Sequence, residues 1–500
     1  MTTAPSQARP DEQDSAFLAE ARSRIGTAGQ PQVARHPVNA PAIADWCDAM
    51  GDDNPVYNDA AAAAASVHGG IVAPPVTLDI WDRGGLKQTR STDDPQAATI
   101  KTLESRGFTS VVVVNSELEI QRYLRPGDML QKVLSLEEVS EEKATGLGVG
   151  HFVTTRQRYT TTSGEHVGDV LFRILKFKPG TGRTAAPPAD GRPVLDTSPH
   201  LRPRPGINRD NEFFWEGCRK HELRMQRDPA TGELFHPPGP KRNPATGKWE
   251  LEYEVCSGRG RLYSFAVPHY PQVPGFKYPV IVGLVELEEG PRLVSNIVGV
   301  DRDQLEIGMP LEVTWLDTHP ALVEGATDSR GPITIPQFRP AAPARQETTR
   351  AAGGVSVGDK LPSWVKDITP TQVVSGALAT RDFQDVHHDR DLAHARGSAD
   401  IFLNINTSVG LMARYVGDWA GPEHIVTATR VRLGAPAYPY DPLTFTGEVI
   451  EADPASGRAV VKVRARNSLG DHVSGTVEML LPGGSDYQSF VNNSAQKAAQ

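Results

Sequence analysis

Apolar and polar residues alternate along two long sections of the chain, and each section begins with a helical pattern. In the first section, Ala42–Met50 has the apolar content of a short helix, with Pro41 at its start and Gly51 at its end. Segments with the two-residue period of half-buried strands follow it. They are Val111–Leu124, Met129–Val139, Gly148–Thr162 and His166–Phe177. The first section therefore predicts a helical layer followed by an antiparallel sheet.

The same plan recurs between residues 357 and 482. A helical start at Thr371–Thr380 leads into an apolar run, Ile401–Met412, which has the content of a buried helix. Two alternating segments, Leu443–Val449 and Val461–Arg466, then predict half-buried strands. This recurrence indicates that one fold is used twice.

Five short segments between the two sections have strand composition and are separated by Gly and Pro turns. They are Trp249–Cys256, Gly260–His269, Val280–Leu287, Leu293–Val300 and Leu311–Leu316. This pattern predicts a small closed barrel.

The composition shifts along the chain predict its domain boundaries. Two stretches, one dense in Pro and Gly and one rich in Ala and polar residues, are interpreted as linkers. The two ends are polar and are expected to be mobile or disordered. The resulting order is a mobile segment 1–35, a first section 36–180, a linker 181–206, a middle section 207–340, a linker 341–356, a second section 357–483 and a tail 484–500.

Charge and cysteine usage exclude several classes of protein. The net charge of -9 is modest for this length and no Lys/Arg block stands out, which argues against a nucleic-acid or anionic-membrane partner. Cys47, Cys218 and Cys256 are far apart and odd in number, so we expect no disulfide framework and a cytoplasmic location. No apolar segment reaches about eighteen residues, so none is expected to span a bilayer.

The candidate chemistry lies just ahead of the second apolar run. Asp382 and His387 are five residues apart, and two titratable groups held close together can share a proton transfer, one as base and one as acid. A helix beginning at Ile401 would add backbone N–H groups for a developing negative charge. In the alternative interpretation, Asp382 is a helix cap or loop acid and the histidine is an ordinary surface residue.

An incomplete copy of this arrangement occurs in the first section. The stretch from Gly51 to Tyr57 aligns with the stretch from Arg381 to His387, so that Asp52 matches Asp382 and Tyr57 replaces the histidine. Tyrosine, with an ordinary pKa of about 10, does not shuttle protons near neutral pH without a large shift. We therefore expect one working pair and a degenerate second site, Asp52 and Tyr57.

The residues around both acids resemble a known family. Gly51 to Val56 looks like the Gly-Asp-x-Asn-Pro-Leu/Val-His motif of MaoC-like (R)-specific enoyl-CoA hydratases. The second copy keeps Asp and His but carries Arg381, Gln384 and Asp385, which is similar to the small catalytic subunit of actinobacterial steroid side-chain hydratases. GlyGlyIleValAlaProPro at 69–75 resembles the N-terminal domain of their larger subunit. The resemblance implies an α+β fold in which two hotdog domains pack as a double hotdog.

The middle section resembles the zinc-ribbon and OB-fold domain associated with thiolase-like proteins. The resemblance is carried by segments at 213–218, 236–238, 257–265, 285–295 and 307–313. That family has a CxxC pair on each side of its HisProPro-like segment. Here the four positions hold Asp228, Thr231, Asn243 and Thr246, which supply no thiolate, so we expect no zinc and no other metal. The resemblance implies an all-β OB-fold domain between the hotdogs that docks a thiolase-like aldolase.

The resemblance also implies hydration of an α,β-unsaturated acyl-CoA whose acyl group is bulky and steroid-derived. Asp382 and His387 would bind the water between them, and which of the two acts as base is left open. Backbone N–H groups near Asp400, Ile401 and Phe402 would hold the thioester oxygen. Coenzyme A enters only as part of the substrate, and no other cofactor is expected.

The non-catalytic hotdog needs a role of its own. Pro74 and Pro75 would shorten or kink its helix, and the space so made would bind the acyl group. We expect a homo-oligomer. Two alternatives stay open, a non-catalytic scaffold that activates an acyl-CoA aldolase and a hotdog acyl-CoA thioesterase.

Overall fold

The computed structural model describes residues 10–86, 94–182, 201–238, 252–318, 333–342 and 345–498. The chain forms two compact units. The first combines residues 1–185, 343–362 and 366–500, and the second combines residues 186–342 and 363–365. The two similar sections therefore fold together, and the middle section folds separately.

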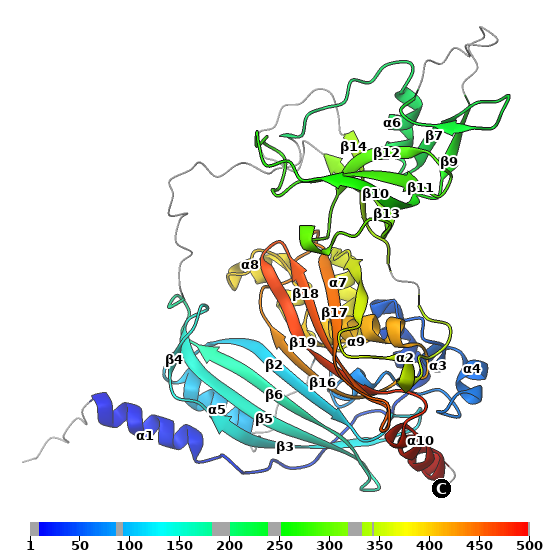
Figure 1. Cartoon of the computed structure of the whole chain (residues 1–500). Helices are drawn as coiled ribbons and strands as arrows, with labels where there is room; N and C mark the ends of the chain where they lie inside the picture. The colour runs from blue at the N-terminus through cyan, green and yellow to red at the C-terminus, as the bar shows by residue number, and fades with distance from the viewer. Residues whose placement is uncertain are drawn as a thin grey trace, which may run out of the picture. The chain divides into compact units, whose positions relative to one another are not determined.

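A sheet of eleven strands, counted within the described residues, is the frame of the first unit (Figure 1). The order is β1-β3-β5-β6-β2 in the N-terminal half and β16-β19-β18-β17-β15 in the C-terminal half, with β4 beside β5. Antiparallel pairing of β2 with β16, in which Leu118 lies opposite Thr429, joins the two halves into one sheet. The bounds are β1 Gln32–Val33, β2 Ser110–Ile120, β3 Leu130–Val139, β4 Lys143–Ala144, β5 Val149–Thr161, β6 His166–Phe177, β15 Lys360–Lys366, β16 Ile425–Leu433, β17 Leu443–Asp453, β18 Arg458–Asn467 and β19 Gly470–Leu480.

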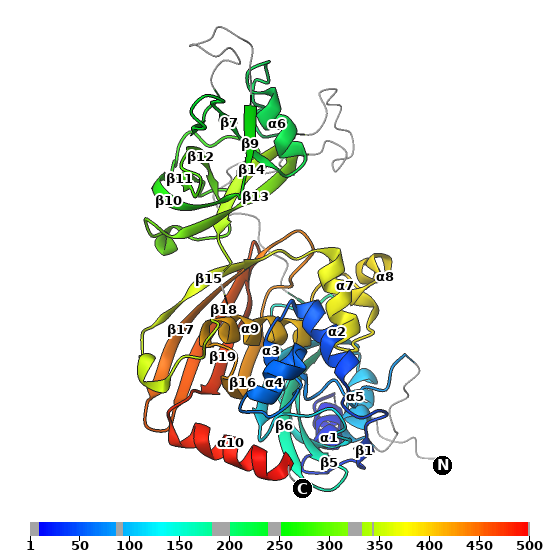
Figure 2. The ribbon, with the colours of Figure 1, turned by 90° about the vertical axis from the view of Figure 1, so that its right-hand side faces the viewer.

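Helix α9 (Ile405–Ala420) is the central helix of the C-terminal half. It begins where the Asn404 side chain accepts the N–H of Thr407 at 2.8 Å, and every residue except Arg414 is buried. It contacts β16 to β19 on one side and helices α2 (Ala40–Met50) and α7 (Pro370–Ala379) on the other (Figure 2). This helix wrapped by a sheet is the C-terminal hotdog.

The N-terminal half keeps only a short remnant of the corresponding helix. Its central segment is η1 (Pro75–Thr77), a three-residue 3-10 helix that contacts α9. Proline lacks an N–H and disfavours the helical conformation in the residue before it, so Pro74 and Pro75 prevent a longer helix here. The predicted shortening is confirmed, and the two halves form a double hotdog. The other helices of this half are α3 Pro55–Asn58, α4 Ala60–Ala65 and α5 Pro95–Glu104.

The N-terminal segment contains a packed helix, α1 (Pro10–Arg22). Phe17 and Ala21 are buried in one apolar cluster with Leu103 and Phe108 of the N-terminal half. The prediction of a mobile segment is therefore wrong for this helix. Its two buried apolar side chains pack against the sheet and α5. A local sequence pattern does not reveal such a distant contact.

The tail is also helical where the structure describes it. Helix α10 (Ser485–Ala498) replaces the expected disorder of residues 484–500. Tyr487 is buried and its hydroxyl donates to the backbone oxygen of Glu423 at 3.1 Å. Phe490 packs edge-on against Tyr123, with ring centroids 6.1 Å apart. A polar helix with two aromatic anchors has too little apolar content for a sequence pattern to detect.

The second unit is a closed barrel with a small sheet and one helix. The barrel order is β10-β11-β12-β14-β13, which confirms the predicted closed barrel. One predicted member is wrong, because the described part of the segment at 249–256 is β9 (Glu252–Cys256), which pairs with β7 (Leu223–Arg227) and not with the barrel. The missing member is β14 (Ile333–Pro340), whose internal Pro336 argues against a strand in a local reading. The other bounds are β8 Leu234–Phe235, β10 Arg259–Ala266, β11 Ile281–Leu287, β12 Arg292–Ile297 and β13 Pro310–Thr318.

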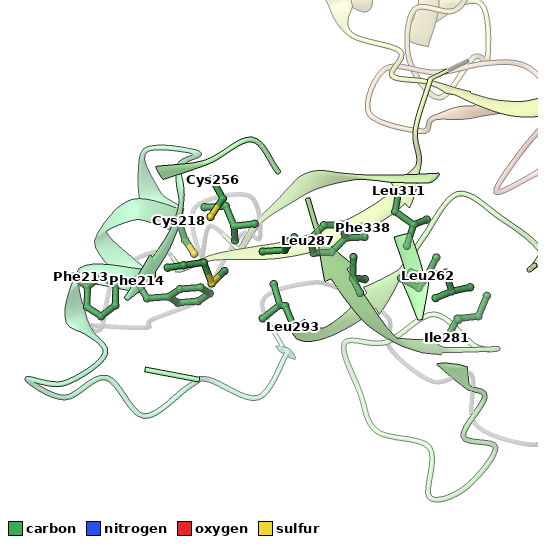
Figure 3. Packing of buried hydrophobic residues seen from close by; sticks show 14 residues of the cluster. Phe213, Phe214, Cys218, Cys256, Leu262, Ile281, Leu287, Leu293, Leu311 and Phe338 are labelled. Atoms are coloured by element: carbon green, nitrogen blue, oxygen red, sulfur yellow. The ribbon is translucent and has the colours of Figure 1, made fainter. Parts of the chain in front are cut away.

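One apolar cluster holds this unit together (Figure 3). Phe213, Phe214 and Cys218 come from helix α6 (Glu212–Arg219), and Leu262 and Phe338 lie inside the barrel. All of these side chains are buried. Apolar packing therefore connects helix α6 to the barrel.

Candidate functional site

The structure brings Asp382 and His387 together. Helix α7 ends at Ala379, and the N–H of Asp382 then bonds back to the Ala377 oxygen at 2.8 Å, which turns the chain sharply. The 3-10 helix η6 (Asp385–His387) carries the histidine back toward the acid. His387 Nε2 lies 3.5 Å from Asp382 Oδ2, and the His387 side chain is only 6% exposed.

The hydrogen bonds of His387 determine its tautomer. Its Nδ1 lies 2.7 Å from the backbone oxygen of Phe402, and a carbonyl oxygen can only accept. Nδ1 therefore carries the proton, and the lone pair of Nε2 faces Asp382. Burial lowers the pKa of His387, while the carboxylate of Asp382 opposes that shift. The pair thus offers a neutral imidazole base beside a carboxylate, out of bulk water.

The helix start lies later than the sequence predicts. Helix α9 begins at Ile405 and not at Ile401, because Asn404 is the cap and the apolar residues before it form a loop. The N–H of Ile401 already donates to Asp400 Oδ1 at 2.7 Å, and that of Phe402 donates to the Val386 oxygen at 3.3 Å. The N–H groups of Ile401 and Phe402, which were expected to hold the thioester oxygen, are therefore already hydrogen-bonded within the chain.

The first turn of α9 offers other donors. Among the described residues, the N–H groups of Ile405 and Asn406 have no hydrogen-bond acceptor, as is usual for the first positions of a helix. Asn404 and its polar neighbours are the signal in the sequence that would have located this turn.

The degenerate site is filled by an arginine. Arg345 donates from one terminal nitrogen to Asp52 Oδ1 at 2.7 Å and to Asp418 Oδ1 at 2.6 Å. Tyr57, which lines the same cavity, is buried, and burial, followed by Tyr123 and the charge of Asp52, raises its pKa well above the ordinary value. The remaining cavity, bounded also by Pro74, has a volume of about 10 Å³, which is room for about one water. We therefore do not assign the acyl group to this cavity.

Three residues near Asp382 and His387 were not singled out from the sequence. Asp79 and Arg83 follow η1 in the N-terminal half, and Asn406 lies in the first turn of α9. They are mutually hydrogen-bonded, so the N-terminal half contributes charged groups to the surroundings of Asp382. Arg345, in a stretch interpreted as a linker, was missed in the same way. The contacts of Asn406 with Arg83 and Asp79, and of Arg345 with Asp52, span hundreds of residues and leave no local pattern.

The first knuckle of the ribbon shows how its turn is held. The Asp228 side chain accepts the N–H of Ala230 at 2.7 Å. Gly232, with a φ of +76°, closes the turn by donating to the Asp228 oxygen at 2.7 Å. The second knuckle at 243–247 lies outside the described residues. Within the described ranges there is no group of three or more His, Cys, Asp or Glu side chains that could hold a metal ion.

No helix among the described residues has both the length and the apolar character needed to cross a membrane. The three cysteines are free and buried.

Comparison with known proteins identifies relatives of each part of the chain. The family described as FAS1-like, dehydratase domain region, matches residues 24–170, and the family described as ChsH2, C-terminal OB-fold domain, matches residues 253–316. The alpha subunit of 3-oxo-4,17-pregnadiene-20-carboxyl-CoA hydratase from Mycobacterium tuberculosis is 40% identical over 307 residues, which cover 60% of this chain and 94% of that protein.

The remaining part of the chain is similar to a second subunit. The beta subunit of the same hydratase is 56% identical over 125 residues, which cover 25% of this chain and 95% of that protein. A DUF35 domain-containing scaffold protein from Methanothermobacter thermautotrophicus is 43% identical over 70 residues, 14% of this chain and 52% of that protein. Sequences similar to two separate subunits are thus joined in one chain.

Proposed function

This chain belongs to the enoyl-CoA hydratase family, with alpha-type and beta-type sequences in one polypeptide, and from this we propose that it adds water across the α,β double bond of an acyl-CoA. The observation that carries the proposal is the close approach of His387 Nε2 to Asp382, with His387 held by Phe402 of the loop that precedes α9. Its expected products are 3-hydroxyacyl-CoA thioesters.

In the proposed mechanism, one water lies between Asp382 and His387. Neutral His387 accepts a proton at Nε2 while the water oxygen attacks Cβ. A proton then passes from the pair to Cα, so that the net change is the addition of one water. The thioester oxygen gains negative charge in the transition state and would accept hydrogen bonds from the backbone N–H groups of Ile405 and Asn406.

We propose a bulky, steroid-derived acyl group because the relatives that match most of this chain act on a pregnadiene-carboxyl-CoA. The cavity beside η1 is not proposed as its binding site, because Arg345 leaves only about 10 Å³ of it open. Coenzyme A would be bound only as part of the substrate, with no other cofactor.

We further propose that the OB-fold unit docks a thiolase-like aldolase that cleaves the hydrated product. The OB-fold family match and the similarity to a scaffold protein support this role. A cytoplasmic location and self-association of the chain complete the proposal, and light scattering of the purified protein tests the latter.

The test is the loss of enoyl-thioester absorbance with a panel of enoyl-CoA substrates that includes steroid-derived ones. Asp382→Asn and His387→Ala should each lower turnover by about 10²- to 10⁴-fold, the usual contribution of general acid–base groups. Asp52→Asn is the matched control, because it changes the corresponding acid of the degenerate site. Normal turnover in both catalytic variants would refute the site, release of free CoA would indicate a thioesterase, and no turnover by the wild type would favour a scaffold.

A further inference from the structure

The N-terminal half sends one arginine to the catalytic end of α9. Arg83 Nη2 donates to Asn406 Oδ1 at 2.8 Å and to Asp79 Oδ2 at 3.0 Å. Asn406 completes the ring by donating from Nδ2 to Asp79 Oδ1 at 2.7 Å. The Arg83 side chain is 24% exposed and that of Asp79 is 12% exposed, so this ring is largely shielded from water. It holds the first turn of α9 from the opposite half.

Arg83 also contacts the turn that carries the catalytic acid. Its backbone oxygen accepts Nε–H of Arg381 at 3.2 Å. Arg381 directly precedes Asp382 and has a φ of +54°, a conformation that a residue with a side chain rarely adopts without support. The same short segment therefore fixes both the Asp382 turn and the start of α9.

The charge of Arg83 acts on both members of the pair. Burial opposes this charge, but Asp79, Asp382 and Asp82 outweigh it and hold the pKa of Arg83 above its ordinary value. Arg83 in turn is one of the groups that lower the pKa of His387, after burial and together with His388.

We propose that Arg83 is a positioning residue for the hydration reaction, an inference that rests on the proposed function. The half without a working acid–His pair would supply a residue whose guanidinium holds the first turn of α9 and whose backbone oxygen holds the Asp382 turn. Its charge would also favour a neutral imidazole at His387, the protonation state that the mechanism requires of the base.

The degenerate site provides a matched control. Arg414 lies beside it, donates from Nη1 to the Met50 oxygen at 2.7 Å and pairs with Asp418 at 3.3 Å. Like Arg83, Arg414 is a partly buried arginine with an acidic partner and a backbone contact. It lies beside Asp52, the acid of the degenerate site, and has no proposed role in the reaction at His387. Its loss should cost stability without touching the reaction.

The experiment compares Arg83→Gln, Arg83→Lys and Arg414→Gln in the full chain, by enoyl-CoA turnover and by NMR titration of the His387 imidazole without substrate. Arg83→Gln should lower turnover by about 10²-fold, the usual effect of a misplaced catalytic group, and raise the titration midpoint of His387. Arg83→Lys keeps the charge and should keep the midpoint near that of the wild type, with intermediate turnover. Arg414→Gln should change neither.

An unchanged His387 midpoint in Arg83→Gln, or equal losses of turnover in Arg83→Gln and Arg414→Gln, would overturn the proposal. If Arg83→Gln does not fold, wild-type turnover in Arg83→Lys would overturn it and reduced turnover with an unmoved midpoint would support it. Failure of the proposed function is a separate result, because the wild type would then hydrate no enoyl-CoA while the titration still reports on Arg83.

Discussion

Arg345→Met should destabilise the first unit without affecting the reaction. The change leaves Asp52 and Asp418, whose side chains are 7% and 9% exposed, without their shared cation. Removing one partner of a buried ion pair costs about 3–5 kcal/mol. Two features reduce this value, since Arg345 is itself 21% exposed and Asp418 keeps Arg414 at 3.3 Å. We expect a loss of about 2–3 kcal/mol near pH 8.

The loss should depend on pH. Burial raises the pKa of Asp418 above its ordinary value of 3.8, and Arg345 opposes that shift, so removing Arg345 raises the pKa further. A carboxyl with a raised pKa takes up a proton in the folded state, and its contribution to stability is lost as the pH rises through the folded pKa. The deficit of Arg345→Met relative to the wild type should therefore be smaller at about pH 5 than at about pH 8.

Urea unfolding followed by tryptophan fluorescence measures both effects. Arg156→Met is the control, because its ion pair with Glu137 is exposed and should contribute less than about 1 kcal/mol. The double variant Asp52→Asn/Arg345→Met should lose less than the sum of the single losses. Unfolding curves that coincide for the wild type and Arg345→Met at both pH values would refute the reasoning.

Two further predictions concern pH and metal. Burial, together with Arg125 and His424, lowers the pKa of His68 to about 4, so stability should fall as the pH drops from about 6.5 toward 4. His68→Phe keeps the stack on Tyr123 (ring centroids 4.9 Å apart) and should remove part of this acid sensitivity in unfolding measurements, whereas an identical acid profile would contradict the shift. Because Asp228 and Thr231 supply no thiolate, a zinc chelator should leave the unfolding temperature of the second unit unchanged, and a fall on chelation with recovery on added zinc would reveal a metal site.

The parts of the site that a short stretch encodes were predictable. Asp382 and His387 lie within one turn and one 3-10 helix, so their spacing in sequence already limits their distance in space. Tyr57 identified the degenerate copy in the same way. Strand-like composition between turn signals located β6 and β3 closely, because both features lie within a short stretch of sequence.

The parts that depend on distant contacts were not predictable. Arg345 lies 293 residues from Asp52 and Arg83 lies 323 residues from Asn406, and nothing near either arginine indicates its partner. The start of α9 was misplaced because apolar content continues through the loop before Asn404, where the cap and not hydrophobicity determines the first turn. β14 was missed because its proline resembles a loop signal.

The pairing of β2 with β16 has a consequence for how the enzyme assembles. Leu118 and Thr429 face each other across the only backbone seam between the halves that the described strands form. Because both strands belong to one polypeptide, the chain sets their effective concentration, and dilution does not separate them. Every molecule therefore carries both Arg83 and Asp382. Because dilution does not separate the two halves, it should not lower the specific activity by breaking the β2–β16 pairing.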